Sequence, residues 1–266
     1  MKTWLIASFA VAALGAQAQA ADPLKAAVAA DHRSVGNVAR DAWRHPYETL
    51  NFFGIKPTDT VVELAPGGGG WYTEILAPYL RDAGQLIAAA DDPASSSQYA
   101  QRSAARFKAK MDSLGVYGKV RITVLDVAAG KLDVAPAGSA DAVLTFRNVH
   151  NWMPQGADKT QAVFHAAFKA LKPGGVLGVV EHRLPATRPQ DPKAASGYVQ
   201  EAVVIKFAEA AGFKLAARSE INANPKDTAD HENGVWTLPP VNNNKDRARY
   251  AAIGESDRMT LKFVKP

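Results

Sequence analysis

Four consecutive glycines, Gly67–Gly70, follow the apolar run Thr60–Ala65 and precede a helical pattern that begins near Tyr72. Glycine permits positive φ and removes Cβ, and four in a row are entropically costly unless the backbone must approach something closely. The N–H groups of such a turn and of the following helix start offer donors to an anionic or polar ligand. The chain is therefore constrained to a strand–turn–helix unit with a ligand site at the carboxyl end of the strand.

Short β-type runs alternate with longer helical patterns, which predicts a parallel sheet with helices on both faces. The helical windows carry apolar residues on one face, at Tyr72–Leu80, Phe164–Leu171 and Val199–Ala210. Pro78 is expected to kink or shorten the first of them. The predicted strands are Thr60–Ala65, Gln85–Ala90, Val120–Leu125, Ala140–Phe146, Val176–Glu181, Phe213–Ile221 and Met259–Val264.

The end of the chain departs from this alternation. No helical crossover separates the last two predicted strands, which suggests an antiparallel pair at the sheet edge. Between them lies the Asn/Pro/Asp-rich stretch Asn222–Arg249, 28 residues long. Because connections of this length without structure of their own are uncommon, we expect the stretch to be functional or to act as a lid.

Two nucleotide-binding patterns fit the glycine loop, each with an alanine where the pattern has a glycine. The loop alone leaves both open, together with a structural turn that binds nothing. A dinucleotide fingerprint takes Ala65, Gly67 and Gly70, with Asp91 about 20 residues further on. The acidic-x-Gly-x-Gly-x-Gly loop of class I methyltransferases takes Glu63, Ala65, Gly67 and Gly69.

The first twenty residues have the pattern of a secretory signal peptide. Lys2 precedes the apolar run Leu5–Leu14, and a small-residue tail ends at Ala20. The run is about ten residues long, whereas a membrane-spanning helix needs ~20. We therefore expect cleavage after Ala20 and a mature chain, 21–266, that forms a single domain without a transmembrane segment.

Composition narrows the function classes further. The chain has no cysteine, which excludes disulfides, thiolate metal sites and cysteine nucleophiles. Together with the signal peptide, this composition suits export to a bacterial periplasm. The formal charge is +5, but basic and acidic residues are interspersed and no run of Lys or Arg forms a stripe, so nucleic-acid binding is not expected.

Several short motifs occur in a fixed order beside the glycine loop. They are Arg44-His45-Pro46, Phe52-Phe53-Gly54, Arg147-Asn148-Val149-His150-Asn151-Trp152, Leu171-Lys172-Pro173-Gly174-Gly175 and Ser256-Asp257-Arg258. From about Arg44 to the C-terminus the sequence resembles class I S-adenosylmethionine-dependent methyltransferases, and closely resembles a group of predicted exported bacterial ones. The resemblance implies a doubly wound, mostly parallel, seven-stranded Rossmann-like sheet with helices on both faces and an antiparallel last strand. It also implies S-adenosyl-L-methionine as the cofactor.

The resemblance also implies roles for individual residues. The backbone at Gly67 and Gly69 approaches the methionyl part of the cofactor, and Glu63 organises the loop. Asp91 is expected to bind the ribose hydroxyls, although the family position itself falls on Ala90. Asp126 and the N–H of Val127 are placed where the family holds the adenine amino group; a helix N-cap is the alternative for Asp126. The full expected cofactor set is Glu63, Ala65, Gly67, Gly69, Asp91, Asp126, Val127 and Arg147.

Polar residues at the ends of the fourth and fifth strands form the expected acceptor side. Methyl transfer depends mainly on near-attack geometry, and a base helps acceptors that must lose a proton. We nominate His150, His182 and Asn148 as the catalytic candidates; for each histidine the alternative is a loop residue with satisfied hydrogen bonds. With Glu181 the histidines suit several divalent ions, but no close-spaced ligand set occurs and no metal is expected.

The expected function is methyl transfer to a small or envelope-associated acceptor, with the oligomeric state left open. A non-catalytic nucleotide-binding protein of the same fold is the first alternative, because export separates the chain from the cytosolic cofactor. A nicotinamide-dependent oxidoreductase is the second, and no Tyr-x₃-Lys pair supports it. A hydrolase is disfavoured because no Gly-x-Ser-x-Gly elbow occurs.

Overall fold

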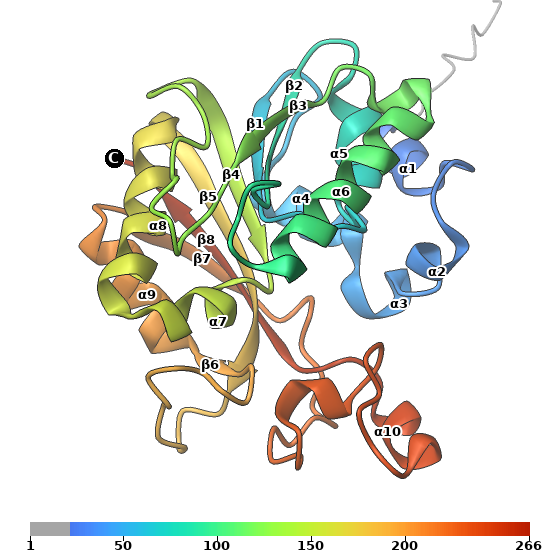
Figure 1. Cartoon of the computed structure of the whole chain (residues 1–266), viewed down its shortest axis with the longest axis vertical. Helices are drawn as coiled ribbons and strands as arrows, with labels where there is room; N and C mark the ends of the chain where they lie inside the picture. Colours follow the sequence, from blue (N-terminus) through green and yellow to red (C-terminus); the bar gives the residue numbers. More distant parts are fainter. Residues whose placement is uncertain (1–21) are drawn as a thin grey trace, which may run out of the picture.

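A mostly parallel β-sheet runs through the protein, and the computed structural model describes it within residues 22–266 (Figure 1). The predicted signal peptide lies outside the described residues. Within them, no helix combines the length and the apolar character that a membrane crossing requires.

Seven strands follow one another in the order β3-β2-β1-β4-β5-β8-β7, and the two-residue strand β6 pairs with β5 beside this path. Strand β8 is antiparallel to both of its neighbours, and the other pairs are parallel. This arrangement confirms the predicted fold class, including the antiparallel last strand. The strands are β1 (Thr60–Leu64), β2 (Gln85–Ala90), β3 (Arg121–Val124), β4 (Ala140–Phe146), β5 (Leu171–Leu184), β6 (Val199–Gln200), β7 (Lys214–Ser219) and β8 (Arg258–Val264).

Helices cover both faces of the sheet, each with its own apolar core (Figure 1). On one face pack α1 (Pro23–Val28), α4 (Pro46–Phe53), α5 (Thr73–Leu80) and α6 (Gln98–Ser113). On the other pack α7 (Val149–Trp152), α8 (Ala157–Ala170) and α9 (Glu201–Ala210). The remaining elements are α2 (Val35–Val38), α3 (Asp41–Arg44), α10 (Arg247–Ile253) and the 3₁₀ turns η1 (Gly115–Tyr117), η2 (Met153–Gln155) and η3 (Gly234–Thr237).

Local patterns placed most elements, with errors at two helix ends. Strands β2 and β4 have the predicted bounds, and α5 is short, with Pro78 in its last turn. Leu171 was assigned to a helical face, but it is extended and pairs with Ala140 at the start of β5. Val199 was likewise assigned to a helix and instead pairs with Arg183 in β6. In both places sheet pairing overrides the apolar spacing of the adjacent helix.

The reversed direction of β8 matters for the site. The parallel strands all present their carboxyl ends at one edge of the sheet, and Arg258, the first residue of β8, pairs with His182 at that same edge. The residues just before β8 therefore arrive beside the ends of β4 and β5. Sequence alone predicted the antiparallel pair at the sheet edge, but not that β8 would insert between β5 and β7.

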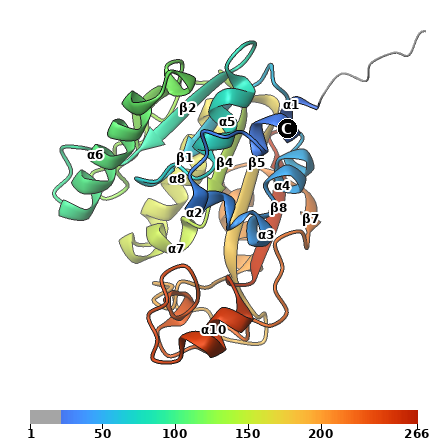
Figure 2. The same ribbon diagram turned by 90° about the vertical axis from the view of Figure 1, so that its right-hand side faces the viewer.

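The N-terminal helices α3 and α4 lie beside the C-terminal part of the chain around β8 (Figure 2). The amide Nδ2 of Asn222 donates to Thr49 Oγ1 at 3.0 Å and to Thr260 Oγ1 at 2.9 Å, which joins α4 to the end of the chain. Trp43 packs over Gly254, where an added Cβ would lie 2.2 Å from the indole ring. The stretch Asn222–Arg249 is not structureless: it contains η3 and the start of α10.

We expect Glu63 to make the protein less stable as pH rises toward neutrality. Burial raises the pKa of its carboxyl from 4.5 to about 7, against the opposing hydrogen bond from Thr73. The unfolded chain therefore loses this proton first, and the stability due to the protonated folded form is lost between about pH 4.5 and 7. At about pH 8 the free energy of unfolding of Glu63→Gln should therefore be up to about 3 kcal/mol higher than that of wild type, because each pKa unit corresponds to ~1.4 kcal/mol.

Urea unfolding across this pH range measures the effect. The matched control is Glu209→Gln, at an exposed position on α9, which should leave the pH dependence of wild type unchanged. Equal pH slopes for wild type and Glu63→Gln would contradict the assignment.

Candidate functional site

A cavity of about 480 Å³ opens at the carboxyl ends of β1, β2, β3 and β4. Its size falls within the ~300–1,000 Å³ range of small-molecule sites. We call it the first cavity. Its lining includes Ala65, Gly67, Asp91, Asp92, Asp126, Val127, Asn148, Trp152 and Trp236.

The glycine loop forms one wall of the first cavity. Gly67 has φ +65°, and no atom lies within 4 Å of the position its Cβ would occupy, so the backbone is exposed to the cavity. Ala65 also adopts positive φ, at +48°, in the position where the methyltransferase pattern has glycine. Gly69 is exposed and lines no cavity, whereas Glu63 is buried and accepts a hydrogen bond from Thr73 Oγ1 at 2.6 Å. Glu63 therefore joins β1 to the start of α5 beneath the loop.

Two carboxylates follow β2, and they differ in their partners. Asp92 forms an ion pair with Lys131 and accepts the Ala94 N–H at 2.8 Å. Asp91 forms no ion pair within residues 22–266, and burial together with the nearby charge of Asp126 raises the pKa of its carboxyl. Asp91 is thus the carboxylate left available to a ligand of the first cavity.

Asp126 and Val127 line the same cavity from the loop after β3. Asp126 Oδ1 accepts the Ala129 N–H at 3.0 Å in a turn, and its backbone exchanges hydrogen bonds with Lys131. No helix begins there in the described chain, so in place of an N-cap the Asp126 side chain holds the turn that follows β3.

A second cavity, of about 270 Å³, adjoins the first and shares Ala65, Gly67, Tyr99, Asn148, Asn151 and Trp236 with it. It is also lined by Phe146 at the end of β4, Arg147 just after it, His150 in α7 and His182 in β5. The stretch predicted to be a lid supplies Val235, Trp236, Pro239, Pro240 and Val241. The N-terminal residues Trp43, His45 and Tyr47 line neither cavity.

Asp227 anchors this covering stretch. Its carboxylate accepts the hydroxyl of Tyr198 at 3.0 Å, lies 2.8 Å from His231 Nε2, and accepts the Asp257 N–H at 2.8 Å. Trp236 then lies edge-on to His150, with ring centroids 6.1 Å apart. The stretch is therefore fixed over the second cavity by a buried polar contact.

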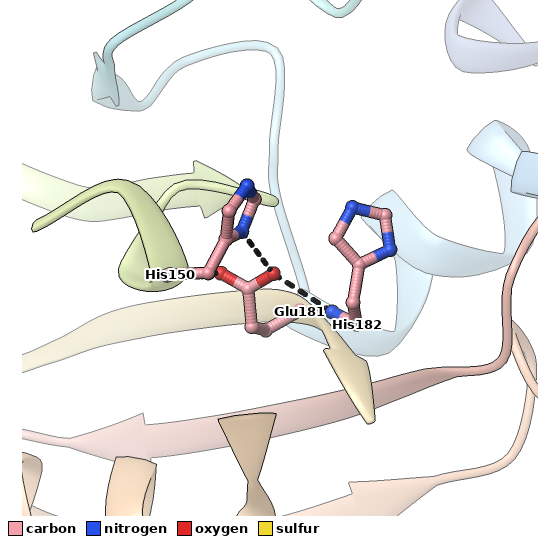
Figure 3. Close-up of side chains that lie close together, drawn as sticks. All are labelled: His150, Glu181 and His182. Carbon is pink, nitrogen blue, oxygen red and sulfur yellow. Dashed lines mark hydrogen bonds and ion pairs between the residues drawn. The ribbon is translucent and has the colours of Figure 1, made fainter. Parts of the chain in front are cut away.

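The two candidate bases meet at Glu181, as Figure 3 shows. Glu181 is fully buried and accepts His150 Nδ1 at 2.9 Å, the His150 N–H at 3.3 Å and the His182 N–H at 2.8 Å. A carboxylate that accepts these bonds places the Nδ1 proton on His150 and leaves the Nε2 lone pair free. The histidine that sequence proposed as a base therefore has an orienting carboxylate directly beside it.

His182 is held differently. Its Nδ1 lies 2.5 Å from Ser256 Oγ, just before β8. Burial, with the positive charge of Arg147 nearby, keeps the pKa of His182 well below its usual range. His182 is therefore a neutral side chain at physiological pH.

The donor atoms of His150, Glu181 and His182 lie within 4.8 Å of one another, although no close sequence spacing announced such a set. Two imidazoles and one carboxylate suit several divalent ions. In this arrangement both Glu181 oxygens accept N–H bonds and His182 Nδ1 contacts Ser256. The contacts present are those of a hydrogen-bonded histidine–carboxylate pair.

Asn148 and Arg147 were predicted as catalytic and cofactor-binding residues. Asn148 lines both cavities, but its Nδ2 donates to Leu64 O at 3.0 Å and to Thr145 Oγ1 at 3.1 Å, so it holds the exit of β1 in place. Arg147 lines the second cavity and not the first. Arg147 therefore lies apart from Asp91 and Asp126, the aspartates of the first cavity that are expected to bind the cofactor.

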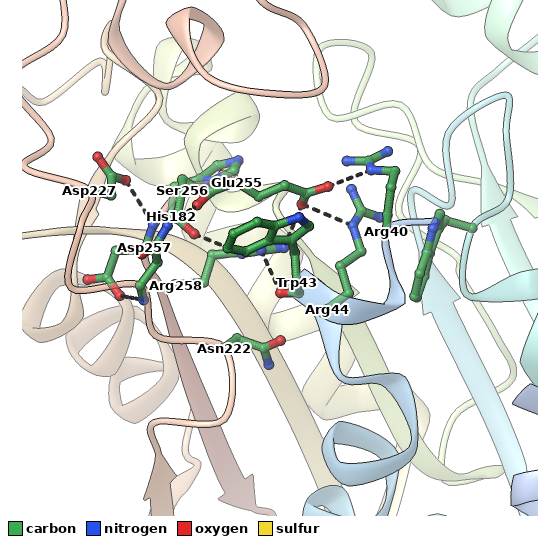
Figure 4. A network of polar contacts seen from close by, with 12 residues as sticks. Arg40, Trp43, Arg44, His182, Asn222, Asp227, Glu255, Ser256, Asp257 and Arg258 are labelled. Carbon is green, nitrogen blue, oxygen red and sulfur yellow. Dashed lines mark hydrogen bonds and ion pairs between the residues drawn. The ribbon is translucent and has the colours of Figure 1, made fainter. Parts of the chain in front are cut away.

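A buried ion cluster is centred on Glu255, which also lines the second cavity (Figure 4). Glu255 pairs with Arg40 at 2.5 Å, Arg44 at 3.2 Å and Arg258 at 3.1 Å. Burial acts to raise the pKa of Glu255, but the three arginines lower it to about 2. Arg44 is almost completely buried and stacks over Trp71 at 4.7 Å.

Sequence reasoning assigned no role in the site to the residues of this ion cluster, to Ser256 or to Trp236. Arg44, Ser256 and Arg258 stood in motifs that carried the family resemblance, and that was the available signal. Glu255 and Trp236 had none, because their importance depends on the route of the chain after β7.

The sequence matches no model of a protein family and no curated protein. Solved structures match the fold over most of the chain. An S-adenosylmethionine-dependent methyltransferase from Aquifex aeolicus superposes with a TM-score of 0.55 at 14% identity, over 92% of this chain and 99% of that one. The methyltransferase SibL gives 0.53 at 15% identity, over 87% of this chain and 57% of that one.

The cyclase SpnF superposes with a TM-score of 0.59 at 17% identity, over 92% of each chain. At these identities the likeness establishes the fold alone. That fold is the one shared by S-adenosylmethionine-dependent methyltransferases, and it also occurs in a protein named for a different reaction.

We expect Glu255→Gln to destabilise the protein by about 3–5 kcal/mol, because it leaves three buried guanidinium groups without their carboxylate. The pKa of about 2 further implies that this stability is present above about pH 4.5 and is lost as pH falls toward 2. Chemical denaturation measures both effects. Glu220→Gln is the control, since its pair with Arg183 is exposed and worth about 1 kcal/mol or less. Equal losses of unfolding free energy in the two variants would contradict this role of Glu255.

Proposed function

We propose that the protein is an S-adenosylmethionine-dependent methyltransferase that acts on a small-molecule acceptor. The observation that carries the proposal is the pair of joined cavities at the carboxyl edge of the sheet. One is lined by the Asp91 carboxylate and open backbone, and the other by His150, which Glu181 orients. A site that only stores a nucleotide has no need of the second cavity and its oriented base.

The residues of the first cavity fit an S-adenosyl nucleotide. Gly67 offers backbone without a side chain in the way, and Asp91 offers a carboxylate for vicinal hydroxyls. Asp126 and the N–H of Val127 offer an acceptor and a donor for a purine edge. The volume of about 480 Å³ accommodates a ligand of this class.

S-adenosylmethionine supplies, when bound, a methyl group on a positively charged sulfur. The protein's part is to align the acceptor and to accept its proton. In the proposed step the acceptor O–H bond breaks, the proton passes to His150 Nε2, and the oxygen bonds to the methyl carbon. The methyl–sulfur bond breaks with its electron pair left on sulfur, and the imidazolium later returns its proton to solvent.

Other residues support this base. Glu181 fixes the tautomer of His150 and stabilises the imidazolium that forms. Trp236 lies against the same ring and covers both cavities, so it excludes water from the place where they join. His182 and Ser256 complete the wall opposite His150.

Binding of S-adenosylhomocysteine tests the proposal first. We expect calorimetric titration of the purified protein to show S-adenosylhomocysteine and S-adenosylmethionine binding and no comparable binding of NAD. Gly67→Trp should abolish that binding, because its side chain would project into the first cavity.

Gly138→Trp is the matched control. Gly138 has φ +63°, against +65° at Gly67, and also has no atom within 4 Å of its Cβ position, but it precedes β4 at the amino edge of the sheet. Unchanged affinity in this variant separates cavity filling from backbone strain. Binding of NAD alone, or of neither nucleotide, would refute the proposal.

We also propose export to a bacterial periplasm, supported by the signal-peptide pattern of residues 1–20. Mass spectrometry of the periplasmic protein should find an N-terminus at Ala21. A cytosolic pool that retains Met1 would contradict export. Methyl transfer by the periplasmic form would separate an enzyme from a protein that only binds the nucleotide.

A further inference from the structure

Arg147 presents an unpaired guanidinium to the second cavity. Within residues 22–266 no carboxylate forms an ion pair with it and its side chain donates no hydrogen bond, whereas Arg40, Arg44 and Arg258 all share Glu255. Buried or half-buried arginines are normally paired, because the guanidinium carries five donors that water would otherwise satisfy. Arg147 is an exception, and it lies in the wall of the proposed acceptor site.

The backbone at Arg147 is also unusual. Its φ is +62°, a left-handed conformation that costs a residue with a Cβ roughly 1–2 kcal/mol. Its N–H donates to Val180 O at 2.7 Å, which fixes this conformation at the end of β4. Strained residues of this kind collect at ligand sites, where the surrounding structure maintains them for function.

The surroundings of Arg147 carry an excess of positive charge. Four arginines, Arg40, Arg44, Arg147 and Arg258, face the two carboxylates Glu181 and Glu255. The Nη2 atoms of Arg40 and Arg44 are buried without a partner in the described chain. Burial lowers the pKa of Arg147 to about 10, so it remains charged at neutral pH, and within residues 22–266 no protein group pairs with that charge.

We propose that the acceptor carries a carboxylate, which pairs with Arg147 while a hydroxyl elsewhere on the same molecule points to His150. This inference rests on the proposed function. A planar carboxylate matches the fork of a guanidinium and forms two parallel hydrogen bonds with it. Such a pair would both neutralise the excess charge and fix the orientation of the nucleophile.

The walls of the second cavity restrict the acceptor further. A volume of about 270 Å³ lies below the usual ~300–1,000 Å³ range, so the ligand is small. Phe146 is held against Tyr72 with the rings stacked 3.5 Å apart, and Trp236 and the pair Pro239–Pro240 form the other apolar surface. Flat apolar walls with one cation and one base fit a small aromatic hydroxy acid.

The test uses 2-, 3- and 4-hydroxybenzoate and the three matching hydroxybenzamides, titrated into the full chain with and without saturating S-adenosylhomocysteine. Tryptophan fluorescence and calorimetry give the affinities. We expect at least one acid to bind about 10-fold or more tightly than its amide, since a charge-assisted hydrogen bond contributes about 1.5–3 kcal/mol.

Arg147→Asn should remove that preference, because asparagine tolerates the left-handed backbone but carries no charge. Arg147→Lys should retain part of it through the charge alone. Arg121→Asn is the matched control at the exposed amino end of β3 and should behave as wild type. S-adenosylhomocysteine should bind Arg147→Asn with unchanged affinity, which also shows that this variant is folded.

The outcomes separate the two proposals. Equal affinity for acid and amide in all three pairs, or a preference that survives Arg147→Asn, would overturn the carboxylate site while S-adenosylhomocysteine binding leaves the proposed function intact. An acid preference that depends on Arg147 in a protein that does not bind S-adenosylhomocysteine would refute the function and support the anion site. Tighter binding of phenyl phosphate than of any hydroxybenzoate would overturn the choice of carboxylate.

Discussion

The common direction of the parallel strands is the constraint on which the rest of this structure depends. Because β1, β2, β3, β4 and β5 all run the same way, their carboxyl ends meet at one edge, and each following loop delivers its side chains there. The glycine loop, Asp91, Asp126 and His150 come from four different loops and still surround two joined cavities. The reversed strand β8 adds Ser256 and Glu255 to the same edge, because its beginning lies where the other strands end.

A buried carboxylate then holds the chain ends over this edge. Glu255 joins the segment before β8 to Arg40 and Arg44 near the start of the described chain. Ionic contacts of this kind add little stability relative to apolar packing, but breaking one is costly because the charges that remain are buried. The cluster thus specifies where the N-terminal helices lie relative to the segment before β8. Glu63 has the opposite behaviour, since it is buried, has no cationic partner within residues 22–266, and keeps its proton to about neutral pH.

The two cavities divide the chemistry between them. Acidic and open-backbone features gather in the first, which suits a nucleoside with hydroxyl and amino groups. Basic and aromatic features gather in the second, which suits a small anion with an ionisable nucleophile. Asn148 and Trp236 border both, so a displacement of either would alter the alignment of two ligands at once. Near-attack geometry in a displacement reaction is sensitive to such displacements.

The sequence by itself determined the strand–glycine–helix unit, the alternation of strands and helices, the antiparallel closing pair and several of the residues that line the first cavity. These follow from local properties: backbone freedom, apolar periodicity and the placement of polar residues directly after strands. Only the tertiary structure decided that Glu181 orients His150 and that Asp92 pairs with Lys131. It also decided that, among residues 22–266, neither Asp91 nor Arg147, which lines the second cavity, has an ion-pair partner. Pairings of that kind join residues that are 31 and 39 positions apart. No local pattern encodes them, because they depend on how strands and loops are brought together by packing.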